Sequence, residues 1–330
     1  MELKKKRILV TTTSFGKADT GLRSSLEAAV GEVIYNPFGR PLSASELIPL
    51  ITDIDGFIAG IDEIDARVIH AAAGLKVISR YGTGIDRIDI DAATRNGIVV
   101  TNTPGANSVA VAELAIGFML SLARNLCRAN QETHQGEWPR YSGISFREKT
   151  VGLVGLGFIG REVAKRMKSF GCRLLAVDPV VEPEIAEKLD VELTSLGDLL
   201  SRSHFVSLHL PVTAATTGLI NREALAQMKP GAFLINTARG ELIDETALSE
   251  ALTSGHLGGA ALDVYSKEPP GKDNCLLQLP QVVLTPHMAS RTDDAMNQMG
   301  RIAMQDCLSV LRGERPRYAV NPEAYGDEKP

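Results

Sequence analysis

Residues 150–178 of this chain read TVGLVGLGFIGREVAKRMKSFGCRLLAVD. A short apolar segment ends at Val154, a glycine-rich turn covers residues 155–160, and a second apolar segment runs up to the acid Asp178. Between the two segments, apolar residues recur at helical spacing. This order predicts a strand, a tight turn, a helix and a second strand, which is the repeating unit of a parallel α/β sheet.

The turn matches the pattern GxGxxG through Gly155, Gly157 and Gly160. The first glycine permits the tight turn, the second lets the main chain approach a pyrophosphate, and the third allows close packing of helix on strand. Phe158 and Ile159 open the helix, where backbone N–H groups and the helix dipole favour negative charge. The turn therefore predicts a dinucleotide site, with a glycine-rich turn that binds no ligand as the alternative.

Asp178 indicates which dinucleotide binds. A carboxylate at the end of the second strand accepts hydrogen bonds from the adenosine ribose hydroxyls and repels a 2′-phosphate. No arginine follows it, since the next residues are Pro179, Val180 and Val181. The sequence thus predicts NAD rather than NADP.

Length and composition suit two globular domains, because the chain has 330 residues, of which 44% are hydrophobic and 23% charged. The net charge of −5 gives no overall basic field, so neither a nucleic-acid partner nor a membrane partner is expected. With no signal peptide, no long apolar run and no CxxC pair for a metal, we expect a soluble cytoplasmic protein. Its four cysteines are expected to be reduced thiols, at Cys127, Cys172, Cys275 and Cys307.

Strand-like and helix-like segments alternate up to residue 101, and again from residue 150 to residue 285. A long helix is predicted between them, from Ser108 to Gln131, and a last helix from Asp293 to Leu311. One helix is too little for a third domain, so the chain is expected to return to its first domain. The predicted domains are residues 1–101 with 290–330, and residues 102–289.

Several polar residues follow predicted strands of the second sheet, where ligands of α/β folds bind. Arg239 follows segment 232–237, Asp263 and Glu268 lie at and beyond the end of segment 259–264, and His287 follows segment 282–285. Oxidising an alcohol beside a carboxylate requires a base for the hydroxyl proton and a cation for the oxygens. His287 with Glu268 as its partner suits the first task, and the planar fork of Arg239 suits the second.

Taken singly, these residues also have ordinary structural explanations. Arg239 is equally suited to a surface ion pair, Asp263 to a strand-end cap and Glu268 to a solvated position before two prolines. Among the other histidines, His209 is the alternative candidate for the base. Position after adjacent strands is what favours the joint catalytic interpretation.

Four ordered motifs resemble those of the D-isomer-specific 2-hydroxyacid dehydrogenases. They are the glycine turn, residues 236–240 (NTARG), residues 261–264 (ALDV) with Glu268-Pro269, and residues 285–287 (TPH). Two further segments, SRYGTGID at 79–86 and NTPGANS at 102–108, are most similar to the D-3-phosphoglycerate dehydrogenase branch. The resemblance covers nearly the whole chain. It implies two Rossmann-like or flavodoxin-like α/β domains with parallel sheets, of which the substrate-binding (lid) domain is discontinuous.

The same resemblance implies roles for individual residues. His287 is then the acid/base, Glu268 its partner, and Arg239 the arginine that binds substrate and takes part in catalysis. Asp263 is then a residue near the nicotinamide, and Thr237 is a further cofactor-binding residue. The resemblance also implies a homodimer formed largely through the NAD-binding domain, and a cleft between domains that closes on the substrate.

A loop at residues 81–83 is expected to bind the substrate carboxylate through the backbone N–H groups of Tyr81, Gly82 and Thr83. The chain departs from the branch after the third strand, where an Arg-Ser pair is usual and residues 59–63 read AGIDE. An acid there would repel a phosphate, and Arg80 is the expected source of the missing charge. No counterpart of the serine-sensing C-terminal domain of some members is expected in this sequence.

The sequence therefore predicts an NAD-dependent D-2-hydroxyacid dehydrogenase that resembles D-3-phosphoglycerate dehydrogenase. Reductases of glycerate, hydroxypyruvate or lactate type remain open as alternatives, so the substrate is a small 2-hydroxy or 2-oxo acid of undetermined phosphorylation. From another class, an NAD-sensing interaction protein of the corepressor type also resembles this family. Formate dehydrogenation is disfavoured, because glutamine would be expected in place of Glu268.

Overall fold

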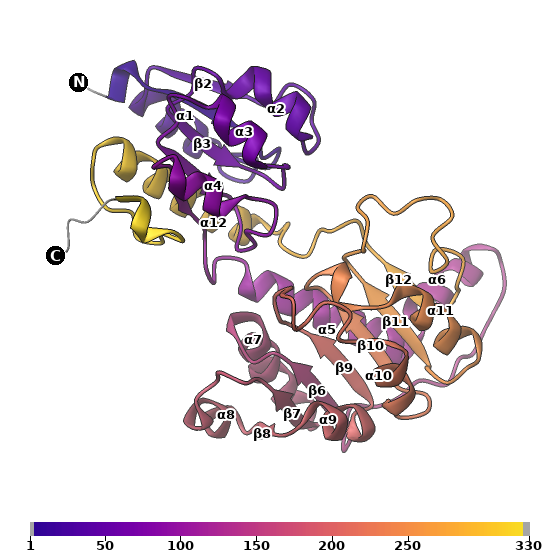
Figure 1. The fold of residues 1–330 in the computed structure, drawn as a ribbon. Coiled ribbons are helices and arrows are strands. Elements are labelled where there is room, and N and C mark those ends of the chain that lie inside the picture. Colours follow the sequence, from indigo (N-terminus) through magenta and orange to yellow (C-terminus); the bar gives the residue numbers. More distant parts are fainter. Residues whose placement is uncertain (1–2, 326–330) are drawn as a thin grey trace. The chain divides into compact units, whose positions relative to one another are not determined.

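The computed structural model describes residues 3–325 and divides the chain into two compact units (Figure 1). These units are Met1–Asn107 with Ser290–Pro330, and Ser108–Ala289. Against a predicted boundary at residue 101, the first unit continues to Asn107 because hydrogen bonds tie this segment to the loop after the fourth strand. Thr83 donates its hydroxyl to Asn107 (3.1 Å), and Asn102 donates its amide to the Thr83 carbonyl (2.9 Å). The last residues of the predicted tail, 326–330, lie outside the described residues.

The first unit is built on a sheet of five parallel strands in the order β2-β1-β3-β4-β5. The strands are β1 (Arg7–Val10), β2 (Glu32–Tyr35), β3 (Gly56–Ala59), β4 (Val77–Arg80) and β5 (Val99–Thr101). The register sets Leu9 of β1 beside Ile34 of β2 and Phe57 of β3. This is the flavodoxin-like strand order. All five strands are parallel, but the direction in which successive strands are added across the sheet changes between β1 and β3.

Helices cover both faces of this sheet. They are α1 (Thr20–Ala29), α2 (Ala44–Ile51), α3 (Ala66–Ala71), α4 (Ile90–Arg95) and α12 (Asp293–Leu311), with short 3₁₀ turns η1 (Leu3–Lys5) and η4 (Pro322–Tyr325). The apolar sides of α2, α3 and α4 share one buried cluster with the sheet. On the other face, α12 lies against β3 and β4, and Ser79 donates its hydroxyl to the Ala303 carbonyl of α12 (2.8 Å). The last helix therefore belongs to the first unit.

The second unit holds seven parallel strands in the order β12-β11-β10-β9-β6-β7-β8. The strands are β6 (Thr150–Val154), β7 (Arg173–Val177), β8 (Glu192–Leu193), β9 (Phe205–Leu208), β10 (Phe233–Asn236), β11 (Gly259–Leu262) and β12 (Val282–Leu284). Counted from β6, this is the doubly wound order 3-2-1-4-5-6 with one further strand at the edge. The predicted class of two parallel α/β domains is confirmed.

Helices cover both faces of the second sheet, and a cluster of buried side chains lies between the sheet and the helices on each face. One contains residues of α5 (Ser108–Arg124), α7 (Phe158–Met167) and α8 (Pro183–Leu189). The other contains residues of α9 (Leu196–Arg202), α10 (Arg222–Gln227) and α11 (Glu245–Thr253). Short 3₁₀ turns η2 (Lys168–Phe170) and η3 (Gly240–Leu242) follow α7 and β10. Both faces of the sheet are thus buried, which explains why its strands are almost wholly apolar.

The long helix predicted from Ser108 to Gln131 was wrong in one respect. The segment forms two helices, α5 and α6 (Leu126–His134), separated by Asn125 with a left-handed backbone (φ 53°). Asparagine adopts this conformation more readily than most residues, so it ends α5 at low cost. α5 is mostly buried, whereas α6 has no buried residue.

Side chains of the expected type cap the helices. In seven helices the residue before the first turn accepts a hydrogen bond from a backbone N–H of that turn, which satisfies a donor that the helix leaves unpaired. These residues are Asp19, Asp65, Asp89, Ser195, Asn221, Asp244 and Thr292.

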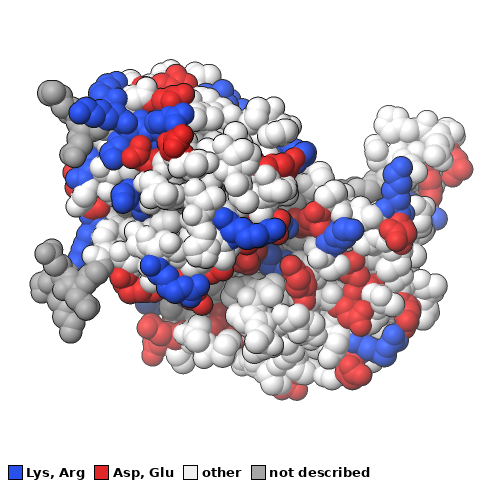
Figure 2. All heavy atoms as spheres, turned by 45° about the horizontal axis from the view of Figure 1, so that its top comes forward, with Lys and Arg blue, Asp and Glu red and all other residues white. Residues whose placement is uncertain are grey.

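Within residues 3–325, no single helix is long and apolar enough to cross a membrane, although α5 and α6, which meet at a 63° bend, pass this test when taken together. On the face drawn in Figure 2, acidic and basic side chains are interspersed rather than gathered by sign.

Candidate active site

The three glycines of the turn after β6 differ in what surrounds them. Gly155 has φ 99°, and a Cβ there would overlap the carbonyl of His209; a Cβ at Gly160 would overlap the carbonyl oxygen of Gly155. At Gly157 a Cβ would meet nothing within 4 Å. The fold itself therefore requires the first and third glycines, whereas the space beside the second is open to a ligand.

Asp178 and Phe158 flank this turn. Asp178, just after β7, accepts the Leu156 N–H through Oδ2 (2.8 Å), so the acid lies against the turn. Its Oδ1 accepts the N–H groups of Val180 (3.0 Å) and Val181 (3.1 Å). Phe158, the first residue of α7, is 63% exposed, while Ile159 packs partly against the core.

Buried polar side chains without a hydrogen-bond partner lie in or just after β9 and β10. His209 follows β9, and neither of its ring nitrogens has a hydrogen-bond partner; Ser207 and Thr237 also have buried hydroxyls without one. Burial lowers the pKa of His209 to about 3, so its imidazole is neutral at physiological pH. Buried polar groups normally find a partner in protein, water or ligand. Together with the open space at Gly157, these groups fit a site for a polar cofactor such as NAD.

His287 and Glu268 meet directly. Nδ1 of His287 lies 2.8 Å from Oε2 of Glu268, and the two side chains are 32% and 17% exposed. The other carboxylate oxygen of Glu268 accepts the Tyr265 N–H (3.3 Å). Because one ring nitrogen faces a carboxylate, the pairing leaves Nε2 of a partly exposed imidazole to face a reactant.

Arg239 follows β10 at the same edge of the sheet. Asn236, the last residue of β10, shapes the turn by donating to the Arg239 carbonyl (2.7 Å) and accepting the Ala238 N–H (2.9 Å). The guanidinium donates to the Ala238 carbonyl (2.7 Å). Since β10, β11 and β12 are parallel neighbours, Arg239, Glu268 and His287 all follow carboxyl ends at one sheet edge.

Tyr265 was not singled out by the sequence. Its hydroxyl donates to the Thr285 carbonyl (2.9 Å), so it supports the segment that carries His287. Burial, followed by the charges of Asp263 and Glu268, raises the pKa of Tyr265 to about 12. The available signal was its position just after Asp263, at the end of β11.

In the first unit, the loop after β4 differs from the expected anion-binding loop. Tyr81 donates its N–H to the Ala59 carbonyl (2.9 Å), and Gly82, with φ 144°, donates to the Arg80 carbonyl (2.9 Å). Two of the three predicted donors are thus used within the unit, one by the end of β3 and one by the loop itself. Among residues 3–325, the N–H of Thr83 donates to no backbone carbonyl.

Asp62, in the loop after β3, and Arg80, at the end of β4, both form hydrogen bonds within the first unit. Asp62 is 1% exposed and accepts hydrogen bonds from the N–H groups of Leu42 (2.8 Å) and Gly60 (3.0 Å) and from the Thr11 hydroxyl. Burial raises its pKa, and these hydrogen bonds with the charge of Arg80 oppose the rise. The Asp62 carboxylate is therefore buried, whereas Glu63 of the same loop is exposed, and the effect of this loop on a phosphate stays a prediction.

Arg80 binds its own loop. It donates to the carbonyls of Gly84 (3.0 Å) and Tyr81, and more distantly to that of Ala59 (3.5 Å). A Cβ at Gly82 would press against this guanidinium, so the arginine supports the loop from close by. Its expected contact with substrate stays a prediction. Among residues 3–325, no three His, Cys, Asp or Glu side chains are placed to hold a metal ion.

A family model for the NAD binding domain of D-isomer specific 2-hydroxyacid dehydrogenases matches residues 116–289. The chain belongs to this family. The D-3-phosphoglycerate dehydrogenase of Archaeoglobus fulgidus is 44% identical over 283 residues, which are 85% of this chain and 54% of that protein. The match confirms the predicted family, its D-3-phosphoglycerate dehydrogenase branch and NAD as the cofactor.

Solved structures agree with this assignment. The TT0316 protein from Thermus thermophilus is 40% identical, with a TM-score of 0.85 over 95% of this chain and 99% of that chain. D-lactate dehydrogenase from Escherichia coli is 30% identical, with a TM-score of 0.82 over 95% and 99%. The chain spans about half the length of the curated relatives it matches, 54% and 57% for two of them.

Proposed function

We propose that this D-2-hydroxyacid dehydrogenase family member is an NAD-dependent enzyme that oxidises the CH–OH group of a D-2-hydroxyacid to a 2-oxo acid, or catalyses the reverse. The observation that carries this proposal is the pairing of His287 with Glu268 at 2.8 Å, at the sheet edge that also holds Arg239. Family membership supports it independently. A dehydrogenase of this kind needs one proton carrier and one cation, and this edge offers both.

The chemistry assigned to each side chain follows from its geometry. His287, held through Nδ1 by Glu268, takes the hydroxyl proton at Nε2 in oxidation and returns it in reduction. Arg239 binds the carboxylate and the C2 oxygen through its planar fork. The turn at residues 155–160 would hold NAD⁺, which would supply the hydride acceptor for the hydrogen on C2 of the substrate.

We infer D-3-phosphoglycerate as the leading substrate. Support comes from relatives named D-3-phosphoglycerate dehydrogenase at 44% identity. D-Glycerate and D-lactate, with hydroxypyruvate as a reducible 2-oxo acid, remain the alternatives. One solved relative is named D-lactate dehydrogenase and another glyoxylate reductase.

A substrate panel tests this proposal. The purified chain is assayed with NAD⁺ and D-3-phosphoglycerate, D-glycerate or D-lactate, with the L-isomers of glycerate and lactate as controls, by following NADH absorbance. We expect turnover with a D-isomer, fastest with the phosphorylated acid, and none with an L-isomer. NADH binding without turnover of any acid, including hydroxypyruvate with NADH, would instead support the NAD-sensing interaction protein.

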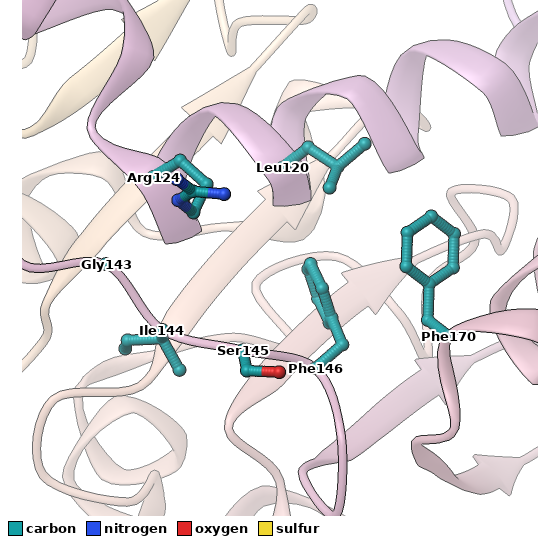
Figure 3. Close-up of a pocket in the computed structure, with 7 residues that line it drawn as sticks. All are labelled: Leu120, Arg124, Gly143, Ile144, Ser145, Phe146 and Phe170. Carbon is teal, nitrogen blue, oxygen red and sulfur yellow. The ribbon is translucent and has the colours of Figure 1, made fainter.

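We also propose that the chain forms a homodimer through Ser108–Ala289. α6 has no buried residue, and Leu126 and the nearby Trp138 are 53% and 83% exposed. The same unit has a pocket of about 490 Å³, and Figure 3 shows side chains of α5 and of the loop after α6 that line it. Its lining residues are Leu120, Arg124, Gly143, Ile144, Ser145, Phe146 and Phe170.

Apolar surface of this kind marks an interaction site, and a second copy of the same segment is the occupant we propose. Light scattering of the intact chain measures the mass, and a monomer at micromolar concentration would contradict the proposal.

We also propose a cytoplasmic location, because the four cysteines are free thiols, as is usual in a reducing compartment. Cell fractionation checks this proposal.

A further inference from the structure

Glu268 lies in an irregular loop that has no buried residue of its own. The chain leaves the core at the buried Tyr265 and returns to it at the buried Leu276. None of residues 266–275 is buried, and they form neither helix nor strand. Apolar burial therefore does not fix the position of the Glu268 carboxylate, so polar contacts have to hold this loop.

Glu245 makes such contacts at both ends of the loop. Its Oε1 accepts the N–H of Ser266 (2.7 Å), and its Oε2 accepts the side-chain amide of Asn274 (2.7 Å). The amide oxygen of Asn274 in turn accepts the N–H of Leu276 (3.0 Å), where the chain re-enters the core. One carboxylate thus joins the two ends of the loop that carries Glu268.

Glu245 itself belongs to a well-anchored helix. It is the first residue of α11, which Asp244 caps by accepting the Ala247 N–H (3.0 Å), and Ala247, Leu248 and Leu252 of this helix are buried. Both bonds of its carboxylate have the short length typical of an ionised acceptor, and such bonds are about twice as strong as neutral ones. A fixed helix therefore holds the loop through a strong contact.

We propose that Glu245 is a positioning residue for the proton-transfer step. It holds the loop so that Oε2 of Glu268 meets Nδ1 of His287 at 2.8 Å, and it acts on the imidazole through Glu268. This inference rests on the proposed role of His287 as acid/base with Glu268 as its partner. It predicts that a side chain one contact removed from the reacting groups changes turnover.

Glu245→Gln is the first test. Glutamine keeps the size of the side chain, but its NH₂ group faces either the Ser266 N–H or the Asn274 amide, so one bond is lost. A misplacement of about 1 Å at the reacting groups costs about 10²-fold in rate, and Glu245 acts through an intermediate residue, so we expect kcat to fall about tenfold. The substrate KM and the Kd of NADH should stay within about twofold of wild type, because no ligand contact is removed. An unchanged kcat would overturn the proposal.

A second substitution should restore the contact. With Asn274→Asp added to Glu245→Gln, the glutamine oxygen accepts the Ser266 N–H and its NH₂ group donates to the new carboxylate, which still accepts from Leu276. Asn274→Asp alone brings two carboxylates together and should lower kcat at least as much as Glu245→Gln. We expect the double variant to recover kcat to within about threefold of wild type. No recovery would overturn the proposal.

Glu268→Ala distinguishes positioning from general damage to the unit. Without the Glu268 carboxylate Glu245 has nothing to position, so Glu245→Gln should lower kcat no further in this background. A merely structural role would lower kcat about tenfold in either background, and that result would overturn the proposal.

Glu250→Gln is the matched control. It makes the same change on the same helix, at an exposed carboxylate that pairs with Arg222, and should leave kcat, KM and the Kd of NADH unchanged. A loss of kcat equal to that of Glu245→Gln would show that any charge change on α11 has this effect, and would overturn the specific role. If Glu245→Gln does not fold, Asn274→Ser takes its place, because it removes only the donor to Glu245. Its kcat should fall by a smaller factor, and an unaltered kcat would count against the proposal.

Failure of the underlying function is recognised separately. If His287→Asn retains turnover, the acid/base role itself is wrong. Loss of turnover in His287→Asn together with full activity of Glu245→Gln overturns only the present inference.

Discussion

Replacing His287 with asparagine is expected to lower kcat by about 10²- to 10⁴-fold, the range that general acid–base groups contribute. Asparagine is preferred to alanine because it tolerates the left-handed backbone at this position (φ 49°), so the change removes the imidazole without adding strain. The Kd of NADH should stay near its wild-type value, because the side chain lies at the ends of β11 and β12 and not at the glycine turn. Stopped turnover with intact NADH fluorescence enhancement is the expected pair of results.

Glu268→Gln is the companion variant. Its amide oxygen still accepts from Nδ1 of His287, but the negative charge that favours the imidazolium is lost. We expect an intermediate fall in kcat, smaller than that of His287→Asn. Full activity of His287→Asn would contradict the assigned role. A loss of NADH affinity as large as the loss of kcat in the same variant would also contradict it.

Gly157→Ala is expected to weaken NADH binding at least tenfold, or about 1.4 kcal/mol, with little change in the thermal midpoint. A Cβ at Gly157 meets no protein atom within 4 Å, and its φ of −74° is ordinary for alanine. The new methyl group therefore costs the fold little, yet it occupies the path by which the main chain approaches a pyrophosphate. NADH fluorescence titration and calorimetry measure the two quantities.

Gly160→Ala is the comparison variant for Gly157→Ala. Its Cβ would overlap the Gly155 carbonyl, so the helix must shift and both the thermal midpoint and the NADH affinity should fall. The contrast between the two variants is the prediction. Normal NADH binding by Gly157→Ala would contradict the prediction that the pyrophosphate lies in the open space beside this glycine.

Much of the fold could be predicted because its signals are local. The strand, turn and helix at 150–178 follow from apolar spacing and three glycines, and the bounds of α12, Asp293–Leu311, coincide with the periodic segment. The left-handed break at Asn125 escaped prediction because the apolar stripe continues across it. A single backbone angle ended that helix without any change in hydrophobic pattern.

The candidate site also has some features that could be predicted from local sequence and others that could not. Residues that follow strands, such as Arg239 and His287, could be named because parallel strands deliver their carboxyl ends to one edge. The partners of the Asp62 carboxylate and of the Tyr81 N–H could not, since Thr11, Leu42 and Ala59 lie on other segments. Of the two acids in the loop after β3, Asp62 is therefore buried among donors, whereas Glu63 is exposed.

By itself, the sequence determined the parallel α/β class and the nucleotide turn and proposed the reacting side chains, because these depend on periodicity, on glycine sterics and on chemical type. Only the tertiary structure decided what each polar group bonds to. Asp263 and residues 285–289 are more than 20 residues apart in the chain and meet because β11 and β12 are neighbours in the sheet. Strand order is a property of the whole packed unit, so a hydrogen bond that depends on it cannot be read from either segment alone.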